Sequence, residues 1–160
     1  MKKLEIKTPI TLYDSLNELP KEVQNLMDEA IKIRKTAYAP YSKFHVGTAF
    51  LLENGEVITG NNQENAAYPS GMCAERVAVW QAASRFPDVR IKIIAITASS
   101  KQNPVTEPVA PCGGCRQALS EYEIKQDADI EIYFMGETGQ IIKTESLHDL
   151  LPLAFDKSFL

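Results

Sequence analysis

Three cysteines and one nearby glutamate are the residues of this sequence best suited to chemistry. Cys112 and Cys115 flank two glycines, and Cys73 supplies a third thiol. The C-x-x-C spacing lets two thiolates converge on one ion, and three thiolates leave the fourth tetrahedral position open, which is typical of a catalytic zinc. Both groups stand at predicted helix starts, where free N–H groups and the helix dipole stabilise anionic sulfur. The sequence therefore predicts one Zn²⁺ ion in each subunit, bound by Cys73, Cys112 and Cys115.

Glu75 follows Cys73 by two residues, on the first turn of the same predicted helix. It can point toward the ion without binding it, and a carboxylate there can take a proton from a zinc-bound water and return it to a substrate nitrogen. Three thiolates on a divalent ion leave a net charge of −1, which opposes ionisation of that water. A hydrogen bond from Arg76 or Arg116 to a ligand sulfur would draw off part of this charge. We expect a hydrolytic site with Glu75 as its proton carrier.

The same residues also allow interpretations without a catalytic zinc. A C-x-x-C pair alone also occurs in thioredoxin-like redox sites, but that gives Cys73 and Glu75 no role. A structural zinc needs a fourth protein ligand, and neither histidine, His45 or His148, stands beside a cysteine in the sequence. Three unrelated buried cysteines are the remaining alternative. The combination of Glu75 with Pro111 disfavours it.

The composition is that of an ordinary globular protein, with 44% hydrophobic and 24% charged residues among 160. The formal net charge of −4 provides no broad attraction to phosphate backbones, so no nucleic-acid partner is expected. The odd cysteine count is a poor basis for disulfides. Charges interrupt the first seven residues, unlike a signal segment, and the apolar stretch 91–98 is too short to span a bilayer. We expect a cytoplasmic protein without a membrane partner.

Helices must position these residues at the end of a sheet. The hydrophobic pattern predicts helices over 21–37, 73–86, 113–122 and 146–151, and strands over 44–52, 56–60, 91–98, 130–135 and after the turn at 139–140. The Asn54-Gly55 pair predicts a hairpin between the first two strands. This alternation indicates a three-layer α/β/α sandwich with a mixed five-stranded sheet. Residues 1–20 are expected to be an N-terminal extension, as a short strand or packed arm, and residues 21–160 the catalytic domain.

The sequence resembles the family of zinc nucleoside and nucleobase deaminases. The stretches Cys73-Ala74-Glu75 and Pro111-Cys112-Gly113-Gly114-Cys115 match its signature. A cysteine as first ligand is similar to the small cytidine deaminase branch and implies a cytidine deaminase-like fold. The other matching stretches, in family order, are Tyr41-Ser42-Lys43-Phe44 with Val46-Gly47, Asn62-Gln63-Glu64-Asn65-Ala66-Ala67-Tyr68, Arg116-Gln117 and Leu150-Leu151-Pro152.

The resemblance implies hydrolysis of cytidine, and of deoxycytidine, to uridine or deoxyuridine and ammonia, in pyrimidine salvage. It implies that Asn62 and Glu64 hold the ribose hydroxyls and that Phe44 packs against the pyrimidine ring. It also implies that the Ala74 amide holds the base carbonyl and that the Pro111 carbonyl accepts from the leaving amine. The expected partner is therefore a small-molecule nucleoside.

Members of this length are typically homotetramers, which implies that Phe155 is contributed to a neighbour's site and that Tyr68 lies at an interface. Three other functions stay open at this point: a deaminase of a cytosine-nucleoside antibiotic of the blasticidin type, a polynucleotide editor, and a zinc-stabilised nucleoside-binding module without turnover. The acidic composition disfavours the editor, and an open metal site beside Glu75 disfavours the binding module. His45 and residues 1–20 have no assigned role.

Overall fold

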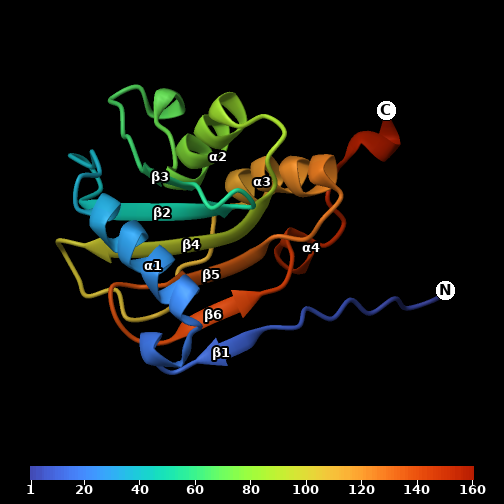
Figure 1. Cartoon of the computed structure of the whole chain (residues 1–160), viewed down its shortest axis with the longest axis horizontal. Helices are drawn as coiled ribbons and strands as arrows, with labels where there is room; N and C mark the ends of the chain where they lie inside the picture. Colours follow the sequence, from blue (N-terminus) through green and yellow to red (C-terminus); the bar gives the residue numbers. More distant parts are fainter.

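A mixed six-stranded sheet forms the middle layer of the molecule (Figure 1). The computed structural model describes all residues from Met1 to Leu160. The sheet has the order β1-β6-β5-β4-β2-β3, and every neighbouring pair is antiparallel except β4 and β5, which are parallel. The strands are β1 (Thr11–Tyr13), β2 (Phe44–Leu52), β3 (Val57–Asn61), β4 (Ile91–Ser100), β5 (Glu131–Met135) and β6 (Ile141–Thr144).

Helices cover both faces of this sheet, which confirms the three-layer α/β/α architecture. They are α1 (Lys21–Arg34), α2 (Ala74–Arg85), α3 (Gly113–Gln126) and α4 (Leu147–Leu150). Side chains alternate between the faces along each strand. In β4, Ile94 and Ile96 pack with α2 and α3, whereas Ile93 and Ala95 pack with α1. The two hydrophobic clusters are therefore separated by the sheet itself.

The sheet has one strand more than the five expected from the sequence. The additional strand is β1, which pairs antiparallel with β6 at the edge of the sheet. Tyr13 secures it, because its ring packs near that of Tyr133 with 6.4 Å between the centroids. Residues 1–10, which precede β1, form neither helix nor strand and are exposed. No helix of the chain is long and apolar enough to cross a membrane.

The fold brings the starts of α2 and α3 together at one end of the sheet. α2 follows β3, and α3 follows β4 through a longer loop, residues 101–112. α2 lies very close to β3, because a methyl group at Gly60 would overlap the carbonyl oxygen of Ala74. Cys73 and Cys112 are the residues immediately before these helices. This end of the sheet, where β2 begins at Phe44, is consequently where the predicted ligands meet.

Candidate functional site

The three cysteines converge as the sequence predicts. Their sulfur atoms all lie within 4.8 Å of one another. The Cys112 sulfur is 3.9 Å from that of Cys73 and 3.5 Å from that of Cys115. Cys73 and Cys112 immediately precede α2 and α3, so their sulfurs lie near the positive ends of two helix dipoles. Cys115, one turn into α3, is fully buried.

The electrostatics of the cluster favour a thiolate. The pKa of Cys73 is lowered, chiefly because its sulfur shares a hydrogen bond with the thiol of Cys115, and also because Arg76 donates to it. The pKa of Cys115 is raised by the same hydrogen bond and by burial. A cation bound between the sulfurs would replace the shared proton, since metal binding releases protons from thiols. Three closely spaced soft sulfur donors fit Zn²⁺ with one coordination position left for water or substrate.

Glu75 stands beside this cluster without belonging to it. It lies on the first turn of α2, is almost fully buried, and lines the cavity described below. Burial raises the pKa of its carboxyl, and the nearby charge of Cys73 raises it further. A raised pKa suits a group that must both accept and release a proton. The position matches the proton carrier expected from the sequence.

Two arginines were candidates to face a ligand sulfur, and only one does. Arg76 donates from Nη2 to the sulfur of Cys73 over 3.4 Å, and its Nε is buried without a hydrogen-bond partner. Arg116 instead donates from Nε to the carbonyl of Pro111 and from Nη1 to that of Leu150, both over 2.8 Å. Arg116 therefore joins the start of α3 to the end of α4, while Arg76 compensates the charge of the cysteines.

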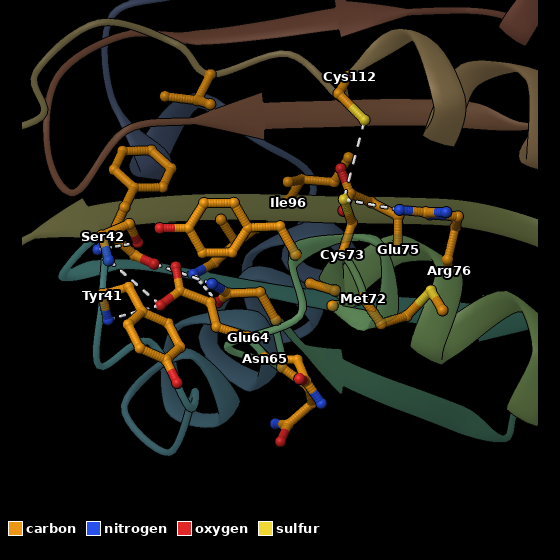
Figure 2. A pocket seen from close by; sticks show the side chains of 18 of the residues that line it. Tyr41, Ser42, Glu64, Asn65, Met72, Cys73, Glu75, Arg76, Ile96 and Cys112 are labelled. Atoms are coloured by element: carbon orange, nitrogen blue, oxygen red, sulfur yellow. Dashed lines mark hydrogen bonds between the residues drawn. The ribbon is translucent and has the colours of Figure 1, made fainter.

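A cavity of about 750 Å³ extends from the cysteines toward the start of β2. Figure 2 shows Cys73 and Cys112 at one end and Glu64, near Tyr41 and Ser42, at the other. Its lining brings together these residues predicted from the sequence: Phe44, Asn62, Glu64, Tyr68, Cys73, Ala74, Glu75, Arg76 and Cys112. It also includes Met72, Ile96, Val109 and Ala110, to which the sequence assigned no role.

Glu64 is held by backbone amides at the far end of the cavity. Its Oε2 accepts from the N–H of Tyr41 over 2.9 Å and from that of Ser42 over 3.2 Å. A hydrogen bond from the Ser42 side chain is the main reason that the pKa of Glu64 is lowered. The carboxylate is therefore ionised and oriented, as recognition of a sugar hydroxyl requires. Tyr41 and Ser42 stand in a quoted motif, but nothing in their types predicted this hydrogen bonding.

Asn62 performs a second task that the sequence did not reveal. Its Oδ1 accepts from the N–H of Val46 over 2.8 Å, and its Nδ2 donates to the carbonyl of Phe44 over 2.9 Å. The regular pairing of β2 with β3 ends at Asn61, so the Asn62 side chain continues it by one step. Asn62 thereby fixes the backbone on both sides of residue 45 and, with it, the half-buried Phe44 ring.

The remaining predicted residues lie apart from the cavity or at its mouth. Tyr68 is 76% exposed and contacts Tyr41 edge to face, with 6.2 Å between the ring centroids. Phe155 is exposed, stacks on Phe159 and does not line the cavity. Pro111 does not line it either, and its carbonyl already accepts from Arg116. One chain alone thus brings neither Phe155 nor Pro111 to the cavity.

Comparisons with known proteins match the part of the chain that carries the cysteines and the cavity. Residues 20–127 match the family described as the cytidine and deoxycytidylate deaminase zinc-binding region. The chain is 42% identical over 132 residues to a cytidine deaminase of Halalkalibacterium halodurans, covering 82% of this chain and 92% of the relative. It is 40% identical over 137 residues to a cytidine deaminase of Sporosarcina psychrophila, covering 85% of this chain and 93% of the relative.

Solved structures show the same fold. The crystal structure of a cytidine deaminase from Burkholderia pseudomallei superposes with a TM-score of 0.71 at 35% sequence identity. The superposition covers 86% of this chain and all of that one. Sequence and structure therefore agree over the part of the chain that carries the cysteines, Glu75 and the cavity.

Proposed function

The chain belongs to the cytidine and deoxycytidylate deaminase family, and on this premise we propose that it is a zinc-dependent hydrolase of cytosine nucleosides. The reaction converts cytidine or deoxycytidine and water into uridine or deoxyuridine and ammonia. One observation carries the proposal: three sulfurs within 4.8 Å of one another lie beside the buried Glu75, at one end of a cavity of about 750 Å³. A cavity of this volume is in the range that encloses small-molecule ligands.

Zn²⁺ held by Cys73, Cys112 and Cys115 supplies a Lewis acid that makes water a strong nucleophile near neutral pH. Glu75 accepts a proton from the attacking water and delivers it to ring atom N3 of the cytosine. The oxygen of that water bonds to C4 of the cytosine. The same carboxyl then carries the remaining proton of this oxygen to the exocyclic nitrogen, the C4–N bond breaks with release of ammonia, and C4 keeps the oxygen as the carbonyl of the uridine product. The Ala74 N–H, at the start of α2, is assigned to the base carbonyl. The assignment of the Pro111 carbonyl to the leaving amine rests on the family resemblance alone, because in this chain that carbonyl accepts from Arg116 and Pro111 does not line the cavity.

The other end of the cavity is assigned to the sugar. The free oxygen of Glu64 and the spare hydrogen-bonding capacity of Asn62 bind ribose hydroxyls, while Phe44 packs on the base. The charged residues lining the cavity are Glu64, Glu75 and Arg76, and Arg76 already donates to a cysteine sulfur. No free cation is left for a phosphate, which supports a nucleoside rather than a nucleotide as substrate.

We also propose a homotetramer in the cytoplasm that acts in pyrimidine salvage. Exposed aromatic side chains at Tyr68, Trp80 and Phe155 support burial against other copies of the chain. Phe155 lies on the C-terminal tail, from where it can reach a neighbouring cavity. We propose residues 21–160 as the catalytic domain and 1–20 as an N-terminal extension, of which β1 joins the sheet; the family match over residues 20–127 and a cavity lining within 41–112 support the catalytic part. Light scattering of the purified protein tests the assembly.

The activity is tested by ultraviolet detection of product from purified, zinc-loaded protein. Cytidine, deoxycytidine and a cytosine-nucleoside antibiotic of the blasticidin type are compared as substrates. The proposal predicts rapid formation of uridine and deoxyuridine and slower reaction of the antibiotic. Turnover of the antibiotic alone, or of none of the three by protein that holds zinc, would contradict it.

A further inference from the structure

The turn between β5 and β6 lies against the segment that forms one wall of the cavity. This turn consists of residues 136–140, and the wall segment consists of residues 105–112. Val109, Ala110 and Cys112 of the wall segment line the cavity, whereas no residue of the turn does. Any effect of the turn on the site must therefore be indirect, and the wall segment contacts both the turn and the cavity.

Backbone hydrogen bonds join the turn to the start of the wall segment. The carbonyl of Val105 accepts from the N–H of Glu137 over 2.7 Å and from that of Thr138 over 3.5 Å. Downstream of this contact the chain runs through Val109 and Ala110 to Cys112. The wall segment has no helix or strand of its own before α3, so this contact is a main anchor of its backbone.

Two glycines of the turn allow this close approach. A methyl group at Gly136 would overlap the carbonyl oxygen of Val105, and one at Gly139 would overlap that of Thr106. Both overlaps are with backbone atoms, which cannot rotate away as a flexible side chain can. A side chain at either glycine would therefore push the turn and the wall segment apart.

Contacts with β4 and α1 hold the turn on the side away from the wall segment. Crowding between the two would therefore move the wall segment. The Thr97 hydroxyl of β4 donates to the carbonyl of Gly136 over 2.7 Å. The buried guanidinium of Arg34 donates to Thr97 and lies 4.0 Å from the carboxylate of Glu137. α1 and β4 thus fix the turn, while the wall segment faces the cavity on its other side.

We propose that Gly139 is a positioning residue of the active site. Because Gly139 has no side chain, the wall segment can pack close to the turn. This packing determines the positions of Val109, Ala110 and the zinc ligand Cys112. The inference rests on the proposed function for its effect on cytidine. The predicted effect of Gly139 on zinc retention depends only on the position of Cys112 and not on the identity of the substrate.

The chain contains a matched control for this proposal. Gly139 has φ 93° and Gly55, in the β2–β3 hairpin, has φ 85°, so alanine is strained at both. A methyl group at Gly55 meets nothing within 4 Å. Gly139→Ala and Gly55→Ala therefore share the backbone strain, and only the first crowds the wall segment. Gly136 lacks a positive φ, so Gly136→Ala adds the crowding without the strain.

The experiment compares these three variants with the unchanged protein, all loaded with zinc. It measures the rate of zinc transfer to a chromogenic chelator, KM and kcat for cytidine, and the melting temperature. Gly55→Ala and Gly139→Ala should both lower the melting temperature, and Gly139→Ala should lower it more because only its methyl group overlaps backbone atoms. Gly139→Ala and Gly136→Ala should release zinc faster and raise KM, each by about tenfold, because small displacements of binding groups have large effects. Gly55→Ala should change neither quantity.

Zinc release and KM for Gly139→Ala that equal those of Gly55→Ala would overturn the proposal. If Gly139→Ala does not fold, Gly136→Ala decides in its place, and unchanged zinc release would overturn the proposal equally. If the unchanged protein does not act on cytidine, the proposed function fails, but zinc release still tests the positioning role.

Discussion

Arg76 donates a hydrogen bond from Nη2 to the sulfur of Cys73 over 3.4 Å. Cys73 immediately precedes α2 and Arg76 lies on its first turn, so the start of one helix positions a zinc ligand and the cation that faces it. The pKa of Arg76 is raised, mainly by this hydrogen bond. The excess negative charge of three thiolates is thus partly balanced at the start of the same helix.

Arg76→Gln should lower kcat for cytidine by about 10- to 100-fold and weaken zinc retention, as is usual when a partner of a metal ligand is lost. The reason is that the uncompensated charge on the sulfurs makes the zinc a weaker Lewis acid. Kinetics and metal analysis check this. Arg85→Gln, which removes an arginine from the far end of α2, is the control and should change neither quantity. Normal rate and zinc content in Arg76→Gln would contradict the role.

Asn62→Ala should both destabilise the fold and raise KM. The change leaves the Val46 N–H and the Phe44 carbonyl without their partners, which costs about 1–3 kcal/mol of unfolding free energy. Denaturant unfolding and steady-state kinetics measure the two effects. Asn61→Ala is the matched control, since the Asn61 amide donates to Ile33 and Thr36 outside the cavity. An equal rise of KM in both variants would show that Asn62 has no special place in the site.

Glu64→Gln should raise KM for cytidine by about tenfold, because a hydrogen bond to a charged acceptor becomes one to a neutral amide. The glutamine oxygen can still accept from Tyr41 and Ser42, so the loop is expected to stay in place. The sharper measurement uses 2′,3′-dideoxycytidine, which keeps the 5′-hydroxyl but lacks the 2′- and 3′-hydroxyls of the sugar. On that substrate the variant and the unchanged protein should have similar KM values. A tenfold difference persisting there would argue against sugar binding by Glu64.

Removal of zinc with a chelator should abolish activity and expose the cysteines to thiol reagents. Cys112 is exposed and the half-buried Cys73 has a lowered pKa, so both should react before Cys115, which is buried and has a raised pKa. Zinc should restore both the activity and the protection. Thiol titration with and without zinc measures this directly. If each cysteine reacts at the same rate with and without zinc, the three cysteines do not bind the ion.

The sequence predicted the layers of the fold because strands and helices alternate along the chain and the apolar residues of α1 follow helical spacing. The helix ends were less predictable. α3 runs to Gln126 rather than residue 122, since the Glu123 carboxylate accepts from the Ser146 hydroxyl and the N–H of Leu147, and the Gln126 amide bonds to Ile91. These are long-range contacts that local periodicity does not contain. β1 was missed from the strand count for a similar reason, because its pairing depends on β6.

The site was predictable to the extent that its chemistry requires particular residue types. Cys73, Glu75 and Cys112 stand in short motifs whose spacing already implies the metal centre. Residues that act through their backbone, such as Ser42 with its N–H on Glu64, leave no such signature. The same holds for Val109, an ordinary apolar residue that lines the cavity only because of where its segment lies.

The central claim is that Glu75 carries the proton in a zinc-dependent deamination. Glu75→Gln keeps the volume of the side chain and removes its ability to exchange a proton near neutral pH. The measurement is uridine formation from cytidine by Glu75→Gln and by the unchanged protein, with the zinc content of each determined in parallel. We predict one zinc ion per subunit in both proteins and a turnover of cytidine about 10²- to 10⁴-fold lower in Glu75→Gln than in the unchanged protein. Turnover of cytidine by zinc-loaded Glu75→Gln at a rate close to that of the unchanged protein would contradict the account.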